Sequence, residues 1–84
     1  MTYEIFYSEQ AEKYLTKLEN ATWQQITNKI DMLSKNPLIG KPLLNVLKNS
    51  RSLRAGNYRV IYKITRPKIL ILRIGHRREI YGRW

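Results

Sequence analysis

The chain has 84 residues, a net charge of +10 and no cysteine. This length suits one domain with a modest core, and the lack of cysteine excludes a disulfide framework and a thiolate metal site. The longest apolar run, residues 69–72, is too short to span a bilayer, and the N-terminus shows no signal peptide. We therefore expect a cytoplasmic protein with no membrane contact.

The charge is distributed unevenly along the chain. Residues 1–31 carry five acids against three lysines, whereas residues 32–84 carry thirteen basic residues and Glu79 as their single acid. Such asymmetry favours a dedicated surface for a polyanion, with RNA as the foremost candidate. The alternative is a basic surface that serves only solubility.

The first third of the chain predicts a short strand and two helices. Residues 3–7 alternate as a strand, and Ser8 with Glu9 fits the start of a helix whose apolar stripe continues to Leu18. A second helix is expected to begin near Thr22, with a capping box to Gln25, and to end at residues 36–37. The buried face expected for this helix consists of Trp23, Ile26, Ile30 and Leu33.

The remaining residues predict a loop followed by three strands. Residues 37–49 are expected to form an ordered loop, and strands are expected around Leu53, over residues 58–64 and over residues 69–74, with turns at 56–57 and 66–68. The predicted fold class is α+β in a single domain over residues 1–84. An N-terminal strand and an α-helical hairpin precede a three-strand antiparallel meander, and together the strands form a four-stranded antiparallel sheet with the helices on one face.

Alternation along the strands predicts which side chains face away from the helices. Tyr58, Val60, Tyr62 and Ile64 should point to the helices and Arg59 away from them. In the last strand, Leu70, Leu72 and Ile74 should point inward, and Ile71 and Arg73 outward. Arg54 alternates with Ser50 and Ser52, and Arg77 can continue the line of arginines at the edge of the sheet. Several guanidinium groups are thus expected on one open surface.

Such a surface fits phosphate chemistry without a metal or another cofactor. Arginine binds phosphate in a bidentate manner and can stabilise charge that develops in a transition state. The basic half has no pair of acids for a two-metal nuclease, and the single His76 has no partner histidine. Tyr81, which lies among arginines in the sequence, could move a proton.

Two motifs in the basic half resemble a known family. Leu53-Arg54-Ala55-Gly56 followed by Asn57 to Ile64 is similar to the "LRxGxYRVxY" strand of the RelE/ParE superfamily of bacterial and archaeal toxins, and residues 74–81 resemble the "GHRxxIY" ending of its RelE-like branch. The resemblance covers essentially the whole chain. It implies the RelE-like fold and the toxin of a type II toxin–antitoxin system. It further implies a ribosome-dependent, metal-independent endoribonuclease that cleaves mRNA in the A site through attack by the 2′-hydroxyl.

The resemblance also implies roles for individual residues. Arg59 matches the arginine on the scissile phosphate, Arg77 the arginine that stabilises the transition state or leaving group, and Tyr81 the tyrosine that orients or deprotonates the 2′-hydroxyl. Two lysines of the family align with Ser50 and Ser52, which is a departure from the pattern. Residues expected to bind RNA, including those that could compensate for this departure, are Lys48, Arg51, Arg54, Arg73 and Arg78.

The expected partners follow from the same resemblance. They are a cognate acidic antitoxin that forms a hetero-oligomer with the toxin, and the 70S-type ribosome with its mRNA. Two other functions remain open from the sequence. One is a ParE-like inhibitor of DNA gyrase that shares the fold, and the other is a non-catalytic RNA-binding domain that uses the same basic face.

Overall fold

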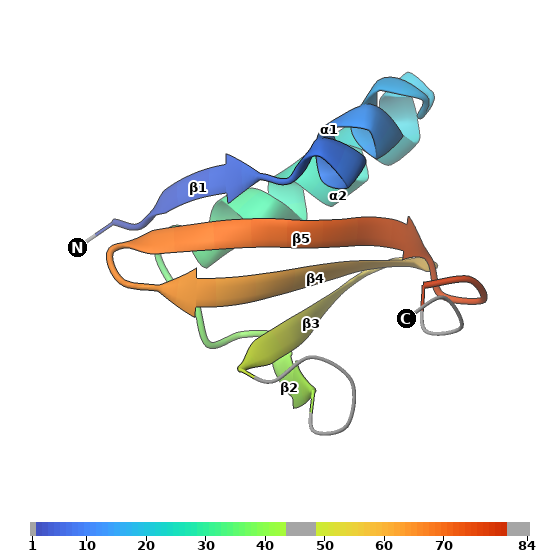
Figure 1. Cartoon of the computed structure of the whole chain (residues 1–84). Coiled ribbons are helices and arrows are strands. Elements are labelled where there is room, and N and C mark those ends of the chain that lie inside the picture. The colour runs from blue at the N-terminus through green and yellow to red at the C-terminus, as the bar shows by residue number, and fades with distance from the viewer. Residues whose placement is uncertain (1, 44–48, 81–84) are drawn as a thin grey trace.

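The computed structural model describes residues 2–43 and 49–80 and contains a helical hairpin and one sheet. Figure 1 shows the two helices together on one side of the sheet. In chain order the elements are β1 (Glu4–Tyr7), α1 (Glu9–Thr16), α2 (Asn20–Leu33), β2 (Lys41–Leu43), β3 (Ser50–Ala55), β4 (Tyr58–Thr65) and β5 (Lys68–His76). In the described part of the chain, no helix is long and apolar enough to cross a membrane.

The helices begin by different means. The Ser8 side chain accepts a hydrogen bond from the backbone N–H of Ala11 and caps α1, as the sequence predicts. The capping box predicted for α2 is wrong, because this helix begins at Asn20 with Glu19 at the N-cap, and Thr22 lies inside its first turn. The prediction for Trp23 is also wrong. Its side chain is 41% exposed, so the buried face of α2 begins one turn later, at Ile26.

The sheet has five strands in the order β1-β5-β4-β3-β2. The antiparallel meander of β3, β4 and β5 is confirmed, but two features of the predicted sheet are wrong. β1 pairs with β5 in parallel, because the helical hairpin returns the chain across one face before the sheet continues. The predicted loop contains β2, a short edge strand paired antiparallel with β3, and an edge strand tolerates Pro42.

The core lies between the helices and one face of the sheet. Ile26, Ile30 and Leu33 of α2 are fully buried there. The buried residues of the sheet that join this cluster are Leu53, Ala55, Val60, Tyr62, Ile69, Ile71 and Ile74. The side chains that alternate with these buried residues along each strand lie on the opposite face of the sheet, which we call the outer face. Arg59 is one of them.

A bulge in β5 changes which side chains reach each face. Arg73 pairs with Ile61 and Ile71 pairs with Tyr62, so Leu72 is an extra residue in the ladder. As a result Ile69 and Ile71 are fully buried in the core, whereas Leu70 is 37% exposed and Leu72 is half-buried. The prediction that Leu70 and Leu72 point to the helices and that Ile71 points away from them is therefore wrong. The predictions for Arg73 and Ile74 are confirmed, because the extra residue at the bulge shifts the alternation back to the predicted one.

Candidate nucleic-acid interface

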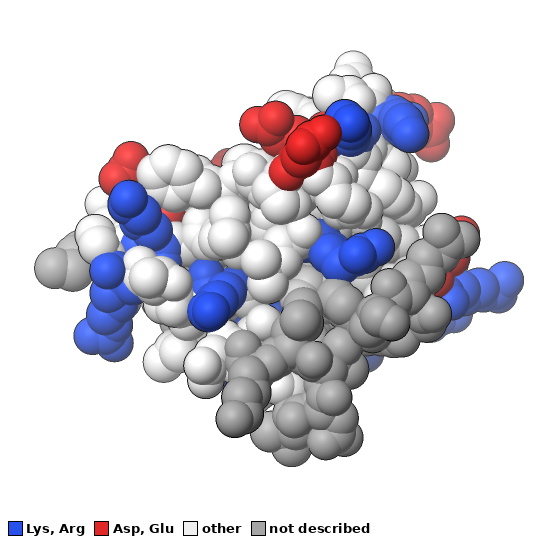
Figure 2. Space-filling view, in the orientation of Figure 1, with Lys and Arg blue, Asp and Glu red and all other residues white. Residues whose placement is uncertain are grey.

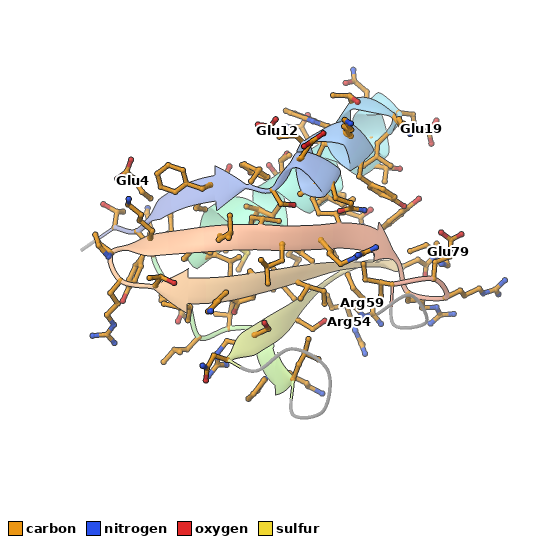
Figure 3. All side chains as sticks on the ribbon, viewed as in Figure 1. Glu4, Glu12, Glu19, Arg54, Arg59 and Glu79 are labelled. Carbon is orange, nitrogen blue, oxygen red and sulfur yellow. The ribbon has the colours of Figure 1, made fainter. Side chains whose placement is uncertain are left out.

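Arg54 and Arg59 lie directly opposite each other at the centre of the candidate site. They are register partners across β3 and β4, and Arg59 is also the partner of Gly75 in β5. Figure 3 shows the two arginines side by side near the end of the hairpin. Side chains in such a pair start about 5 Å apart, and like charges in this position destabilise a sheet. Residues that lower the stability of the fold are typical of a binding site. The ligand that suits this pair is an anion held between the two guanidinium groups.

The turn between β3 and β4 fixes the direction of the Arg59 side chain. Its Nη1 donates hydrogen bonds to the carbonyl oxygens of Gly56, at 3.2 Å, and of Tyr58, at 3.0 Å. Gly56 has a φ of +61°, and the Gln25 side chain occupies the space that a Cβ there would need. Glycine is therefore favoured at this turn for its backbone conformation, and a Cβ there would also require the Gln25 side chain to move.

Arg73 reaches the outer face because of the bulge, and α1 holds the strand at this point. The Ser8 hydroxyl donates to the Leu72 carbonyl at 2.6 Å. The Gln10 amide pairs with both backbone groups of Ile74, at 3.1 Å each. These bonds satisfy backbone groups of β5 on the side where β1 has ended at Tyr7. Two side chains near the start of α1 thus fix the backbone on both sides of Arg73.

Arg77 and Arg78 follow β5 in a turn that is tied to the same end of the sheet. The Arg77 N–H donates to the Asn57 carbonyl at 2.8 Å, and the Arg78 N–H donates to Nδ1 of His76 at 3.2 Å. The His76 ring also makes an edge contact with Tyr58, with centroids 5.5 Å apart. The backbone of both arginines is therefore positioned beside the β3–β4 turn, and their side chains are exposed.

The turn ends with Ile80, which packs on the one residue of β5 that has no side chain. Ile80 is 3% exposed, and its Cδ1 lies 2.9 Å from the place where a Cβ of Gly75 would be. An alanine at Gly75 would displace Ile80. Because Gly75 is the register partner of Arg59, this packing ties the end of the described chain to the centre of the site.

Lys41 is a basic residue of the site that the sequence analysis missed. It is the register partner of Ser52, and both lie next to Arg54 and Arg59 along a cavity of about 610 Å³. Lys29, Met32, Ile39, Pro42, Leu43 and Leu53 complete its lining. Lys41 was missed because residues 37–49 were interpreted as a loop. The glycine before it is the one local signal of a change in the backbone here, and the three residues of β2 are too few for a pattern to indicate a strand.

The remaining predicted site residues are placed differently or lie outside the description. Arg51 projects on the helix side of β3, where its Nη1 donates to the carbonyls of Gly40, at 2.5 Å, and Leu38, at 3.4 Å. Its charge is therefore used to hold the segment that leads into β2. Lys48 and Tyr81 lie outside the described residues. The structure thus brings Arg54, Arg59, Arg73 and Arg77 to the outer face or its end, and separates Arg51 from them.

Among the described residues, no carboxylate forms a salt bridge with Lys41, Arg54 or Arg59. Across residues 2–43 and 49–80 the one salt bridge joins Lys13 to Glu9, on α1. The same residues contain no cluster of three or more histidine or acidic side chains that could hold a metal ion. Burial raises the pKa of Tyr62 and of Tyr14, for which Tyr58 and Glu79 contribute further, so both phenols hold their protons more tightly than usual. Neither tyrosine is suited to act as a general base.

Three comparisons relate this arrangement to known proteins. Residues 5–81 match the family model described as the ParE toxin of type II toxin–antitoxin systems, parDE. A stretch of 54 residues is 44% identical to the toxin RelG of Mycobacterium tuberculosis and spans 61% of this chain and 62% of that protein. The chain therefore matches less than two thirds of the length of this relative.

Solved structures show the same fold over most of the chain. The RelBE2 toxin–antitoxin complex of Mycobacterium tuberculosis contains a chain that is 31% identical, with a TM-score of 0.81, covering 90% of this chain and 99% of that one. The archaeal RelE–RelB complex from Pyrococcus horikoshii gives 27% identity and a TM-score of 0.74 over the full length of both chains. The intact E. coli RelBE complex, at 22% identity and a TM-score of 0.75, covers 88% of this chain and 95% of its counterpart and supports the fold alone.

Proposed function

The chain belongs to the RelE/ParE superfamily of toxins from type II toxin–antitoxin systems, and from this premise we propose that it cleaves mRNA in the ribosomal A site without a metal ion. The observation that carries the proposal is the direct pairing of Arg54 with Arg59 on the outer face, next to Gly75. Two opposed guanidinium groups that form no salt bridge with any described carboxylate can hold one phosphodiester through both non-bridging oxygens. Lys41 adds an ammonium group along the same cavity.

The proposed reaction is an internal transfer within the RNA. The 2′-oxygen forms a bond to the adjacent phosphorus while the bond from phosphorus to the 5′-oxygen breaks, which leaves a 2′,3′-cyclic phosphate and a 5′-hydroxyl. Arg59 and Arg54 stabilise the charge that builds up on the phosphate oxygens, and Arg77 stabilises the leaving oxygen. In this scheme Tyr81 takes the proton of the 2′-hydroxyl as its phenolate, and the leaving 5′-oxygen takes a proton from water to become the 5′-hydroxyl. Tyr81 is proposed because it follows Ile80 directly in the sequence, and because the pKa values of the partly buried Tyr14 and the buried Tyr62 are raised, which makes both poor bases.

The proposed partners are a ribosome carrying mRNA and an acidic antitoxin. Several solved structures with this fold are toxin–antitoxin complexes, which supports an antitoxin for this chain and a hetero-oligomer of the two. The net charge of +10 favours an acidic partner. The compartment of the proposed reaction is the cytoplasm, where translation takes place.

Purified protein added to translating ribosomes tests the proposal. Arg59→Ala should reduce A-site cleavage by about 10²-fold or more, because one donor to the developing charge is lost. It should not lower the temperature of thermal unfolding, because the side chain lies at the surface of the sheet and its loss removes the like charge opposite Arg54. Lys35→Ala, which removes one exposed positive charge at the end of α2, is the matched control and should cleave like the unmodified protein.

The same assay distinguishes the other functions that fit the fold. The matching family model is named for ParE toxins, so inhibition of gyrase supercoiling with intact mRNA would assign the chain to gyrase inhibition instead. Salt-sensitive RNA binding with neither effect would indicate a non-catalytic binding domain. Full cleavage by the Arg59→Ala variant would show that the site is placed wrongly.

A further inference from the structure

The outer face carries a second group of basic residues at the end opposite Arg54 and Arg59. Lys63 of β4 is the register partner of Leu70 in β5, and Leu70 is the partner of Phe6 in β1. Lys68 occupies the next row, between Thr65 and Glu4. Figure 2 shows lysines and arginines gathered over this end of the sheet, at the turn between β4 and β5. We call Phe6, Lys63, Lys68 and Leu70 the turn-end patch.

The patch exposes an aromatic ring among its charges. Phe6 is 42% exposed and its neighbour Leu70 is 37% exposed, although both belong to regular strands. The ammonium of Lys68 lies 5.3 Å from the centroid of the Phe6 ring, within the range of a cation–π contact. The ammonium lies over one face of the ring, so Phe6 combines an exposed apolar surface with a positive charge directly beside it.

A buried residue separates the two ends of the outer face. Ile61, which lies between Arg59 and Lys63 on this face of β4, is 0% exposed. Lys63 is four residues from Arg59 along β4, which is about 13 Å at the usual rise of a strand, and Lys68 lies about 20 Å away, opposite Thr65. A ligand that reaches both ends must therefore be an extended polymer of several units.

We propose that the turn-end patch binds a single-stranded segment of RNA, with one base stacked on Phe6 and the neighbouring phosphates beside Lys63 and Lys68. Arg66, exposed in the adjoining turn, adds a further positive charge. Stacking on an aromatic ring within a basic groove is the usual way in which proteins hold single strands without reading their sequence. This proposal rests on the proposed function for the identity of the RNA, which would be the mRNA that is cleaved or the ribosomal RNA around it.

The chemistry of the patch favours RNA over an acidic protein. Lysines satisfy phosphates as point charges and need no planar fork, and a half-exposed ring offers a stacking surface that any base can use. The one acid in the patch's rows is Glu4, which stands opposite Lys68 and forms no salt bridge among the residues described. The patch therefore keeps a net positive charge around an apolar centre.

The test uses a single-stranded RNA of about ten nucleotides whose 2′-hydroxyls are methylated, so that it binds but cannot be cleaved. Phe6→Ala should weaken binding by about tenfold, because stacking of one base is worth about 1–3 kcal/mol. Phe6→Tyr keeps the aromatic face and should bind like the unmodified protein. This second variant also separates loss of the ring from damage to β1.

Two charge variants complete the experiment. Lys63→Ala should reduce the slope of log affinity against log salt by about 0.7, the value for one phosphate contact in a single strand. Lys17→Ala removes an exposed charge at the end of α1 and should leave the slope unchanged. Because the RNA is uncleavable, this result does not depend on whether the chain is a nuclease.

The proposal is overturned if Phe6→Ala and Lys63→Ala bind this RNA as tightly as the unmodified protein. It is equally overturned if both variants keep their RNA affinity and lose only the binding of the cognate antitoxin, since the patch would then be a protein interface. A folded protein that binds RNA through the patch but cleaves no message would contradict the proposed function and leave the patch standing.

Discussion

The two hairpins that share β4 differ in regularity. β3 and β4 pair without interruption from Ser50–Lys63 to Ala55–Tyr58, whereas the ladder between β4 and β5 contains a bulge at Leu72. Alternation assigns every residue of β4 correctly and fails for β5 between Ile69 and Leu72. Alternation along a strand therefore predicts the buried face only where the ladder is continuous. One extra residue in the strand moves all the side chains that follow it to the opposite face.

The sharpest test of this difference is a pair of neighbouring substitutions in β5. Ile71→Ala should lower the free energy of unfolding by about 2–5 kcal/mol, because Ile71 is fully buried in the core. Leu72→Ala should cost about 1 kcal/mol or less, because Leu72 is the half-buried residue of the bulge. Urea unfolding of the two variants measures both values. The reverse order of the two costs would mean that β5 has no bulge at this position.

Tyr62 lies where the two hairpins meet, and its hydroxyl gives a test that depends on pH. It donates to the Pro37 carbonyl at 2.6 Å and accepts from the Gly40 N–H at 3.0 Å. Tyr62→Phe should therefore cost about 2 kcal/mol, since buried polar groups lose their partner. Gly40 accepts no larger residue here, because a Cβ would meet the Tyr62 ring and hydroxyl.

The pH dependence of this contribution has a definite sign. Burial raises the pKa of Tyr62 in the folded protein above 10.0, the ordinary value. The stability that depends on its protonated hydroxyl is therefore complete below pH 10.0 and is lost as the pH rises through the folded pKa. The gap in unfolding free energy between the unmodified protein and Tyr62→Phe should narrow above pH 10.0. A gap that stays constant there would show that the phenol is not protected by burial.

The smallest expected effect concerns the charge pair of the regular hairpin. Arg54→Ala should raise the free energy of unfolding by about 0.5 kcal/mol at low salt, because it removes the like charge opposite Arg59. The gain should disappear at high salt. Lys63→Ala, at a row of the same hairpin where the partner is Ser50, is the control and should bring no gain. Thermal unfolding at two salt concentrations measures both, and a stability loss in Arg54→Ala at low salt would argue against electrostatic strain.

Much of the fold could be predicted from the sequence because local signals agree with the final structure. Ser8 caps α1 as expected, Ile26, Ile30 and Leu33 form the buried stripe of α2, and the glycine at position 56 marks a turn that needs a positive φ. The Arg54–Arg59 part of the site followed from alternation along β3 and β4. In each of these features, residues that are close together in the sequence determine the local structure.

The features that were mispredicted depend on contacts between distant segments. The direction of β1 is decided by its pairing with β5, about 64 residues away in the chain, and alternation carries no information on strand direction. The bulge is stabilised by Ser8 and Gln10 from α1. Lys41 joins the site only because three residues pair with β3, which is too short a strand to recognise from its pattern.

The bonds from Ser8 and Gln10 to β5 also have a consequence for self-association. Where β1 stops, at Tyr7, these two side chains bond to the Leu72 carbonyl and to both backbone groups of Ile74. A foreign strand that approached this margin would find these three groups already hydrogen-bonded. The residues at the start of α1 therefore hinder edge-to-edge association of two copies of the protein through β5.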